Sequence, residues 1–338
     1  MTHPSQALPI IAITMGDPCG IGPEVIAKAL NQRAVTDLCR PVVIGSAAVM
    51  QSAVRATKVP LTVKTVAGPQ AVTSAHGTVE VIDLENLPAD AVQLGKISPP
   101  AAKAAVEWIL HAGKLCLSGS VAAMATAPIN KEAADLAGYK AIGHMELLQE
   151  QSGSKNVATM LMTKNLRVVH LTTHKSLRVA CDYVTYQNVL DKIVLTHQSF
   201  QKWGWPKPRI AVAALNPHAS DGGLIGTEEA QHITPAVQEA KKRGIDVSGP
   251  HGADYIFHQA AQGKYDVVLA MYHDQGHVAI KVHGFEESIS VNLGLPFVRT
   301  SVDHGTAFDI AGKGIADATS MVESIRMAAL LATGKRMA

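Results

Sequence analysis

The sequence has few aromatic residues, few cysteines and no run of charge of one sign. Only 4% of its 338 residues are aromatic although 47% are hydrophobic, so a core of this size must consist mainly of Ala, Val, Ile and Leu. That composition is typical of α/β proteins, whose parallel sheets are buried on both faces. A chain of this length is expected to form about two domains.

The balance of charge excludes several classes of partner. Thirty basic and 28 acidic residues give a net charge of +2, without a basic cluster that could follow a nucleic acid or an anionic membrane. No apolar run approaches the ~20 residues of a membrane-spanning helix, and the N-terminus has no features of a secretory signal. The sequence therefore predicts neither a nucleic-acid partner nor a membrane partner.

The four cysteines form no CxxC pair and no even framework of spacings. Disulfides are rare in reducing compartments, where isolated cysteines serve mainly in packing. The cysteine pattern therefore predicts a cytoplasmic protein.

Short apolar runs alternate with segments of helical spacing along the whole chain. The predicted strands are Pro9–Met15, Pro41–Gly45, Val121–Thr126, Val157–Met162, Arg167–Thr172, Arg209–Ala214 and Asp266–Met271. The predicted helices are Gly22–Asn31, Pro100–Leu117, Lys131–Ala137, Gln187–Trp203, Thr227–Arg243 and Asp317–Leu331. This alternation predicts βαβ units and an open, parallel α/β sheet. The stretch 67–100, rich in Ala, Gly, Pro and polar residues, is interpreted as a surface connection.

A single histidine follows three of the predicted strands, at His174, His218 and His273. Residues so far apart in sequence meet only if neighbouring parallel strands bring their carboxyl ends together, where α/β proteins bind ligands. Neutral imidazole is the commonest metal ligand, and three histidines leave positions open for substrate oxygens. A divalent ion and hydrogen bonds to loop backbone remain equal alternatives at this point, with Asp274 as a carboxylate that would orient His273.

The segment His273–His277 also has the i, i+4 histidines of a zinc-protease helix. We expect no helix there, because the segment follows a strand directly and Gly276 opposes a helix. His277 is interpreted as a loop or packing residue.

Two glycine-rich segments are candidates for binding a cofactor. Gly16–Glu24 lies between a strand and a helix but matches neither the dinucleotide fingerprint nor a phosphate-binding P-loop. The second segment follows His218 and contains Gly222, Gly223 and Gly226, which could let a loop wrap a dinucleotide. An ordinary mobile loop is an equal alternative there.

Several polar residues are candidates for holding an anionic substrate. Lys281, Asn292 and Arg299 lie within a short stretch, and Arg299 stands among apolar residues. A buried arginine needs an anionic partner, which either a substrate or Asp303 would supply. His144 stands at a predicted helix start that either faces an anion or is simply a capped end.

Together these segments resemble the 4-hydroxythreonine-4-phosphate dehydrogenase (PdxA) family over residues 10 to 320. The matching segments are GDPCGIGPE, TAPINKE, GHMELL, TTHKSLR, LNPHASDGGLIGTEE, GPHGAD, AMYHDQGH and VNLGLPFVRTSVDHGTAFDIAGKG. The first segment is also similar to the GDGIGPE turn of isopropylmalate and isocitrate dehydrogenases.

The resemblance implies two α/β/α domains with a cleft between them, like those of isopropylmalate and isocitrate dehydrogenases. The expected domains are residues 1–133 with 301–338, and residues 134–300, which would carry most metal and dimer contacts. The resemblance also implies a homodimer whose active site is shared between subunits.

The resemblance assigns roles to individual residues. It implies that His174, His218 and His273 bind a divalent ion (zinc, cobalt, magnesium or manganese) and that His144, Lys281, Asn292 and Arg299 bind substrate. Met145 stands beside His144 where the family usually has threonine, so a hydroxyl donor is replaced by an apolar side chain. Lys131 and Asp274 are the candidates for proton transfer.

The implied reaction is the oxidative decarboxylation of a phosphorylated 3-hydroxy acid with NAD. The alternative substrates are 4-phosphohydroxy-L-threonine of pyridoxine biosynthesis and 4-phospho-threonate or -erythronate of sugar-acid catabolism. The N-terminal segment AITMGDP…GIGPE is slightly more similar to the catabolic branch. A terephthalate cis-dihydrodiol dehydrogenase (decarboxylating) is the next alternative. A metal-dependent hydrolase would need no glycine-rich cofactor loop, and intact histidines argue against an inactive binding protein.

Overall fold

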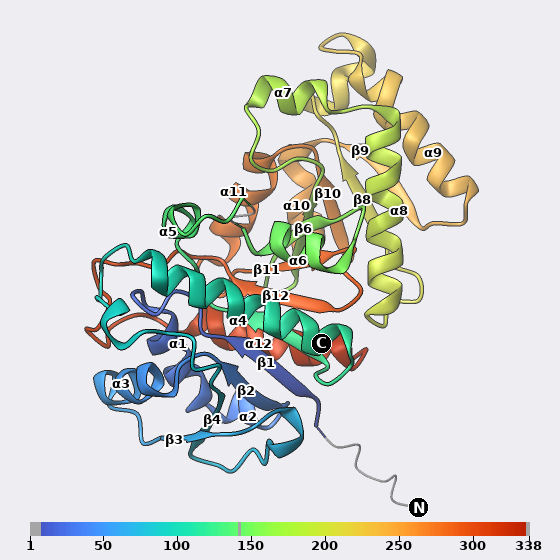
Figure 1. Cartoon of the computed structure of the whole chain (residues 1–338). Coiled ribbons are helices and arrows are strands. Elements are labelled where there is room, and N and C mark those ends of the chain that lie inside the picture. The colour runs from blue at the N-terminus through green and yellow to red at the C-terminus, as the bar shows by residue number, and fades with distance from the viewer. Residues whose placement is uncertain (1–7, 141–142, 336–338) are drawn as a thin grey trace, which may run out of the picture. The chain divides into compact units, whose positions relative to one another are not determined.

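The computed structural model describes residues 8–140 and 143–335, which form two compact units (Figure 1). The first unit contains the described residues up to 154 and those from 295 onward, and the second contains residues 155–294. These divisions lie at 154/155 and 294/295, whereas the sequence predicted 133/134 and 300/301. Helix α6 (His144–Ser152) packs on α4 (Pro99–Leu117), and β12 (Val298–Val302) pairs with β5 (Ala123–Thr126), which places both elements in the first unit.

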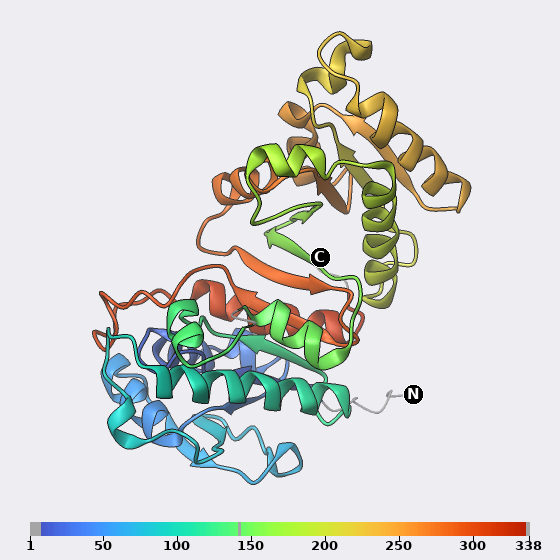
Figure 2. The same cartoon turned by 45° about the horizontal axis from the view of Figure 1, so that its top comes forward.

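The first unit is a parallel sheet in the order β3-β4-β2-β1-β5-β12, with helices on both faces (Figure 2). Its remaining strands are β1 (Ile10–Thr14), β2 (Arg40–Ile44), β3 (Thr62–Thr65) and β4 (Thr78–Ile82). Its remaining helices are α1 (Gly22–Leu30), α2 (Arg33–Thr36), α3 (Ala47–Thr57), η1 (Pro69–Ala71), η2 (Ala89–Ala91), α5 (Lys131–Leu136) and α12 (Thr319–Ala332). Strand β1 lies between β2 and β5, so the sheet grows in both directions from β1.

The second unit is a mixed sheet in the order β11-β6-β7-β10-β8-β9. Its strands are β6 (Ala158–Thr163), β7 (Leu166–His170), β8 (Ile210–Ala213), β9 (Val247–His251), β10 (Val267–Ala270) and β11 (Ile289–Leu293). Its helical segments are α7 (Leu177–Asp182), α8 (Tyr186–Lys202), η3 (Pro217–Gly223), η4 (Glu229–Ile233), α9 (Thr234–Lys242), α10 (Ala253–Ala261) and α11 (His273–His283). Helices α10 and α11 pack over one apolar cluster that includes Val168, Val268 and Ile280.

The α/β fold is confirmed, and all seven predicted strands and six predicted helices are present. Three expectations are wrong in part. The stretch 67–100 contains the buried strand β4, whose alternation is hidden among small residues. Strands β6 and β7 form an antiparallel hairpin instead of a parallel pair, because only two residues connect them.

The third correction concerns the segment from His273, which is the first residue of helix α11. Gly276 is needed inside this helix for space, because a Cβ there would overlap His170 Nε2 and lie 2.8 Å from Val168 Cγ1. The glycine therefore lets the helix approach β7 closely and does not end it.

No helix in the described ranges, 8–140 and 143–335, is both long and apolar enough to cross a bilayer.

Candidate functional site

Three parallel neighbours of the second unit, β7, β10 and β8, end at the same edge of the sheet. The loop after β7 carries His174, the loop after β8 carries His218, and His273 follows β10. The prediction that these three strand ends adjoin is therefore confirmed, because the register aligns β10 with both of its neighbours.

The imidazole of His273 is oriented by the carboxylate that follows it. Its Nδ1 lies 2.6 Å from Asp274 Oδ1. A carboxylate accepts this bond, so Nδ1 is the donor and Nε2 is the ring nitrogen that could bind an ion. This pairing of a carboxylate with a histidine is typical of metal-binding histidines.

His174 and His273 are brought together by this edge of the sheet. Their ring centroids are 6.0 Å apart. Metal–nitrogen bonds of about 2 Å allow one ion to bind two imidazoles at such a separation. The pair therefore fits a divalent ion.

His218 lies on an unusual backbone. Residues His218 to Gly222 all have positive φ, between 45° and 71°, although four of the five are not glycine. Its Nδ1 lies 3.2 Å from Asp221 Oδ2, and its side chain is 66% exposed. His218 is thus paired with a carboxylate, as His273 is, but it lies on a strained turn.

Within the described residues, no three His, Cys, Asp or Glu side chains of one chain are close enough to hold one ion. The structure therefore brings His174 and His273 together but leaves His218 outside their group.

Two polar residues outside the predicted set hold the strand ends. Gln275 accepts a bond from the backbone N–H of Met271 at 2.7 Å and donates one to Ala214 O at 2.7 Å, which ties β10 to β8. The buried carboxylate of Glu229 accepts the backbone N–H groups of Leu215 and Asn216, each at 2.8 Å. The position of Gln275 just after a predicted strand was an available signal that the sequence analysis missed, whereas Glu229 lies far from β8 in sequence and had no such signal.

In the first unit, the loops after β1 and β5 meet where the direction of strand order reverses. Asp17 donates its backbone N–H to Pro128 O at 2.9 Å. Gly16 has φ +72°, and a Cβ there would overlap the Pro128 carbonyl, so glycine is required for this contact. Such a switch point is the usual ligand-binding place in an α/β sheet.

Arg299 lies in the interior beside this switch point. Its Nε and Nη2 donate to Thr126 Oγ1 at 3.1 and 2.6 Å, and the residue is 5% exposed. Burial lowers the pKa of its guanidinium to about 9, and the charge of Glu146 partly offsets this effect. A cation that burial disfavours to this degree favours an anionic ligand.

His144, the first residue of α6, adjoins the same cation. Burial lowers the pKa of His144 well below the usual range, and the charges of Arg299 and Lys131 lower it further. A hydrogen bond with the Ala127 backbone raises this pKa, but by less. Its buried Nε2 has no hydrogen-bond partner among the described residues. Burial and the charges of two cations therefore favour a neutral His144 imidazole, an arrangement suited to an anion.

The family described as pyridoxal phosphate biosynthetic protein PdxA matches residues 37–328. The chain belongs to the PdxA family.

Relatives of this PdxA-family chain are named dehydrogenases. One from Symbiobacterium thermophilum, with the provisional name D-threonate 4-phosphate dehydrogenase, is 48% identical over 97% of this chain and 98% of its own. The structure of a 4-hydroxythreonine-4-phosphate dehydrogenase from Klebsiella pneumoniae is 41% identical, with a TM-score of 0.89 over 96% of this chain and 99% of that one. A terephthalate 1,2-cis-dihydrodiol dehydrogenase from Burkholderia xenovorans is 30% identical, with a TM-score of 0.68 over 98% and 100%. The prediction of an oxidoreductase of this family is confirmed.

Two predicted substrate residues of this PdxA-family chain lie in the second unit. Lys281 donates to Ser288 Oγ at 2.9 Å and lies 4.6 Å from the centre of the Phe285 ring. Asn292 is buried in β11. Met145, in the first unit, occupies the first turn of α6 beside His144.

The glycines predicted to bind the cofactor differ in environment. Gly222 and Gly223 have φ of +71° and +100°, and a Cβ at either position would have nothing within 4 Å. A Cβ at Gly226 would overlap the Asn216 side chain. The neighbouring Leu224 is 89% exposed, so this loop lies at the surface.

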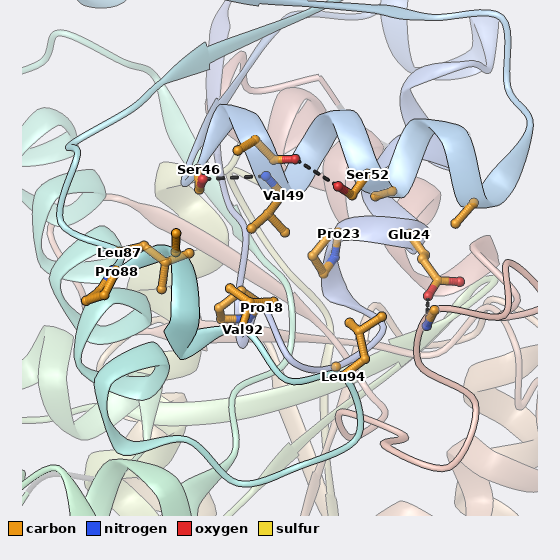
Figure 3. A pocket seen from close by; sticks show the side chains of 16 residues that line it. Pro18, Pro23, Glu24, Ser46, Val49, Ser52, Leu87, Pro88, Val92 and Leu94 are labelled. Carbon is orange, nitrogen blue, oxygen red and sulfur yellow. Dashed lines mark hydrogen bonds between the residues drawn. The ribbon is translucent and has the colours of Figure 1, made fainter.

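A pocket of about 430 Å³ in the first unit lies at the ends of β1, β2 and β4 (Figure 3). Pro18, Pro23, Val49, Leu87 and Leu94 give it a largely apolar lining. The buried Glu24 at its side accepts the backbone N–H groups of Gly312 and Gly314, which fixes the loop from 305 to 316 beside it. Apolar pockets at strand ends suit planar cofactor rings.

Proposed function

We propose that the chain oxidises a phosphorylated 3-hydroxy acid with NAD, and that 4-phospho-threonate or its erythronate isomer is the substrate. The main observation behind this proposal is the buried Arg299, which is hydrogen-bonded to Thr126. Its charge and that of Lys131 both act on His144, an arrangement that suits a phosphate. Several similar proteins carry the provisional name D-threonate 4-phosphate dehydrogenase, and these names support the same substrate class.

We propose a divalent ion held by His174, His218 and His273. The 6.0 Å between the His174 and His273 rings and the Asp274 and Asp221 contacts support it. When bound, zinc, cobalt, magnesium or manganese would polarise the substrate hydroxyl. A homodimer with a shared active site agrees with the separation of His218 from the other two histidines within one chain.

The chain's own residues would orient the substrate for hydride transfer. Arg299 and His144 of the first unit, with Met145 next to His144, would hold an anionic group of the substrate. Lys281 and Asn292 of the second unit are likewise proposed to bind substrate. Transfer of hydride from C3 to NAD with loss of the hydroxyl proton would give a 3-keto acid. Its C1–C2 bond would then break to release CO2, and C2 of the resulting enol would take up a proton. Lys131 is the preferred proton carrier, because Asp274 already orients His273 at 2.6 Å.

We propose two places for NAD. The apolar pocket of the first unit would take a planar ring of the cofactor, and the loop with Gly222, Gly223 and Gly226 in the second unit is the alternative place. A Val49→Trp variant, which fills the pocket, should raise KM for NAD without changing KM for substrate. The cytoplasm remains the expected compartment, on the cysteine pattern alone.

The test is NADH and CO2 production across a panel of substrates with and without added divalent ion. The panel contains 4-phospho-D-threonate, 4-phospho-D-erythronate, 4-phosphohydroxy-L-threonine, terephthalate cis-dihydrodiol and unphosphorylated threonate. Preference for the first two, with loss of turnover on chelation, supports the proposal. Preference for the dihydrodiol, or turnover without any ion, would contradict it.

A further inference from the structure

Two histidines outside the predicted metal set lie behind His273. His170 ends β7 and is 2% exposed, and His277 lies in the second turn of α11. The His277 ring stacks on the His273 ring, with centroids 3.5 Å apart and planes inclined by 14°. The centroid of the His277 ring is also 4.6 Å from that of His170.

The hydrogen bonds of the row formed by His273, His277 and His170 indicate which ring nitrogens carry protons. His277 Nδ1 lies 3.1 Å from both His170 Nε2 and the backbone oxygen of His273. A carbonyl oxygen can only accept, so Nδ1 of His277 carries the proton and donates to both atoms. His170 Nε2 is then the acceptor, and the neutral His170 ring carries its proton on Nδ1.

Space for this row is made by Gly276. Any side chain there would overlap His170 Nε2, so the first turn of α11 can lie against β7 only because position 276 has no Cβ. Two imidazoles in such a place cost desolvation free energy that aliphatic side chains of similar size would avoid. Their hydrogen bonds to each other and to the His273 carbonyl offset this cost and fix their geometry.

We propose that His277 and His170 are positioning residues that hold the His273 imidazole in the orientation required to bind a divalent ion. Stacking restricts rotation of the His273 ring, while Asp274 holds its Nδ1, so Nε2 would be the nitrogen presented to an ion. His170 acts through His277, because the hydrogen bond of its Nε2 is to His277 Nδ1. This inference rests on the proposed role of His273 as a metal ligand.

The first experiment separates ring stacking from hydrogen bonding in the purified full chain. His277→Phe keeps a stacked ring but removes the donor, and His277→Asn keeps a donor near the Nδ1 position but removes the ring. Affinity for Co²⁺ is measured from its visible absorption, together with the melting temperature of the metal-free protein. Both variants should weaken Co²⁺ binding by roughly 10- to 100-fold, the usual effect of partners behind a metal ligand.

The matched control is His283→Phe, which makes the same change at the end of the same helix, where His283 contacts Asn165. Its Co²⁺ affinity should stay within about twofold of the wild type. If both His277 variants bind Co²⁺ as tightly as this control, the row serves packing only and the inference is overturned.

The second experiment tests whether His170 acts through His277. His170→Leu should weaken Co²⁺ binding in the wild-type background and have no further effect in His277→Phe. Additive losses would show that His170 acts independently, which contradicts the proposed order. The variants of His277, which is less buried than His170, keep the proposal testable if His170→Leu does not fold.

His273→Ala separates the failure of this inference from the failure of the proposed function. If the wild type binds Co²⁺ and His273→Ala does not, while the His277 variants match the wild type, only the inference is overturned. If His273→Ala binds as tightly as the wild type, the proposed metal site and the inference are both overturned.

Discussion

The strand ends of the two units differ in how they prepare polar side chains for a ligand. In the first unit, Arg299 and Thr126 are buried and hydrogen-bonded, and His144 is kept neutral by burial and by neighbouring cations. In the second unit, His218 and His273 have side chains 66% and 38% exposed, and carboxylates orient their rings.

On the proposed assignment of a phosphate to the first unit and a divalent ion to the second, the difference teaches that two kinds of ligand need two kinds of site. Anion recognition gains strength from a low local dielectric, which burial supplies. Metal binding needs lone pairs that point outward, which hydrogen bonds at Nδ1 supply without burial. The following predictions test this contrast, from the largest expected effect to the smallest.

Arg299→Met removes the buried cation of the first unit. KM for a phosphorylated substrate should rise roughly a hundredfold, equivalent to about 3 kcal/mol, because a desolvated charge pair is lost. KM for unphosphorylated threonate should change far less. Steady-state kinetics on both substrates measure the difference, with the exposed Arg33→Met as control. An equal rise for both substrates would mean that Arg299 does not bind the phosphate.

Gly276→Ala places a Cβ against His170 and Val168. The free energy of unfolding should fall by about 1–3 kcal/mol, because the helix must move from β7. Urea denaturation measures it, and Gly305→Ala, with nothing within 4 Å, is the control. A variant as stable as the control would show that α11 tolerates a larger separation from β7.

Stability at acid pH depends on His170. Burial and the charges of His277 and His273 lower its pKa from the ordinary 6.5 to about 3. A hydrogen bond with the Thr159 backbone only partly offsets this shift. Between these values the unfolded chain binds a proton that the folded chain does not, so stability falls as the pH falls. At pH 5 the loss relative to pH 7.5 should be about 2 kcal/mol.

The measurement is urea denaturation of metal-free protein at both pH values. His170→Leu should lose less stability on acidification than the wild type, whereas the exposed His258→Leu should lose as much as the wild type. Equal losses in all three would assign the acid sensitivity to other groups.

Ala219→Gly relieves the left-handed turn of the second unit. Ala219 has φ 54°, a conformation that costs a non-glycine residue about 1–2 kcal/mol. The variant should therefore be about 1 kcal/mol more stable, whereas Ala48→Gly in helix α3 should be about 0.5 kcal/mol less stable. Thermal unfolding checks both signs. A destabilised Ala219→Gly would show that the turn is not strained.

Much of this architecture follows from local sequence. Apolar runs of four to six residues ending in polar loops identify the seven predicted strands, because a buried strand needs a continuous apolar stretch. Two elements escaped this prediction. Strand β4 lies among small and polar residues that read as a surface connection, and α11 contains Gly276, whose low helix propensity argues against a helix. Propensity is a weak prior, and the close contact with His170 outweighs it.

The sequence by itself determined the family, the α/β class and the residues that stand at strand ends. Only the tertiary structure decided which of them meet: His174 with His273, Arg299 with Thr126, and His170 with His277 behind the predicted metal ligand. The physical reason is that strand order and helix approach are set by packing between segments far apart in the chain. No local pattern of residues contains those distances.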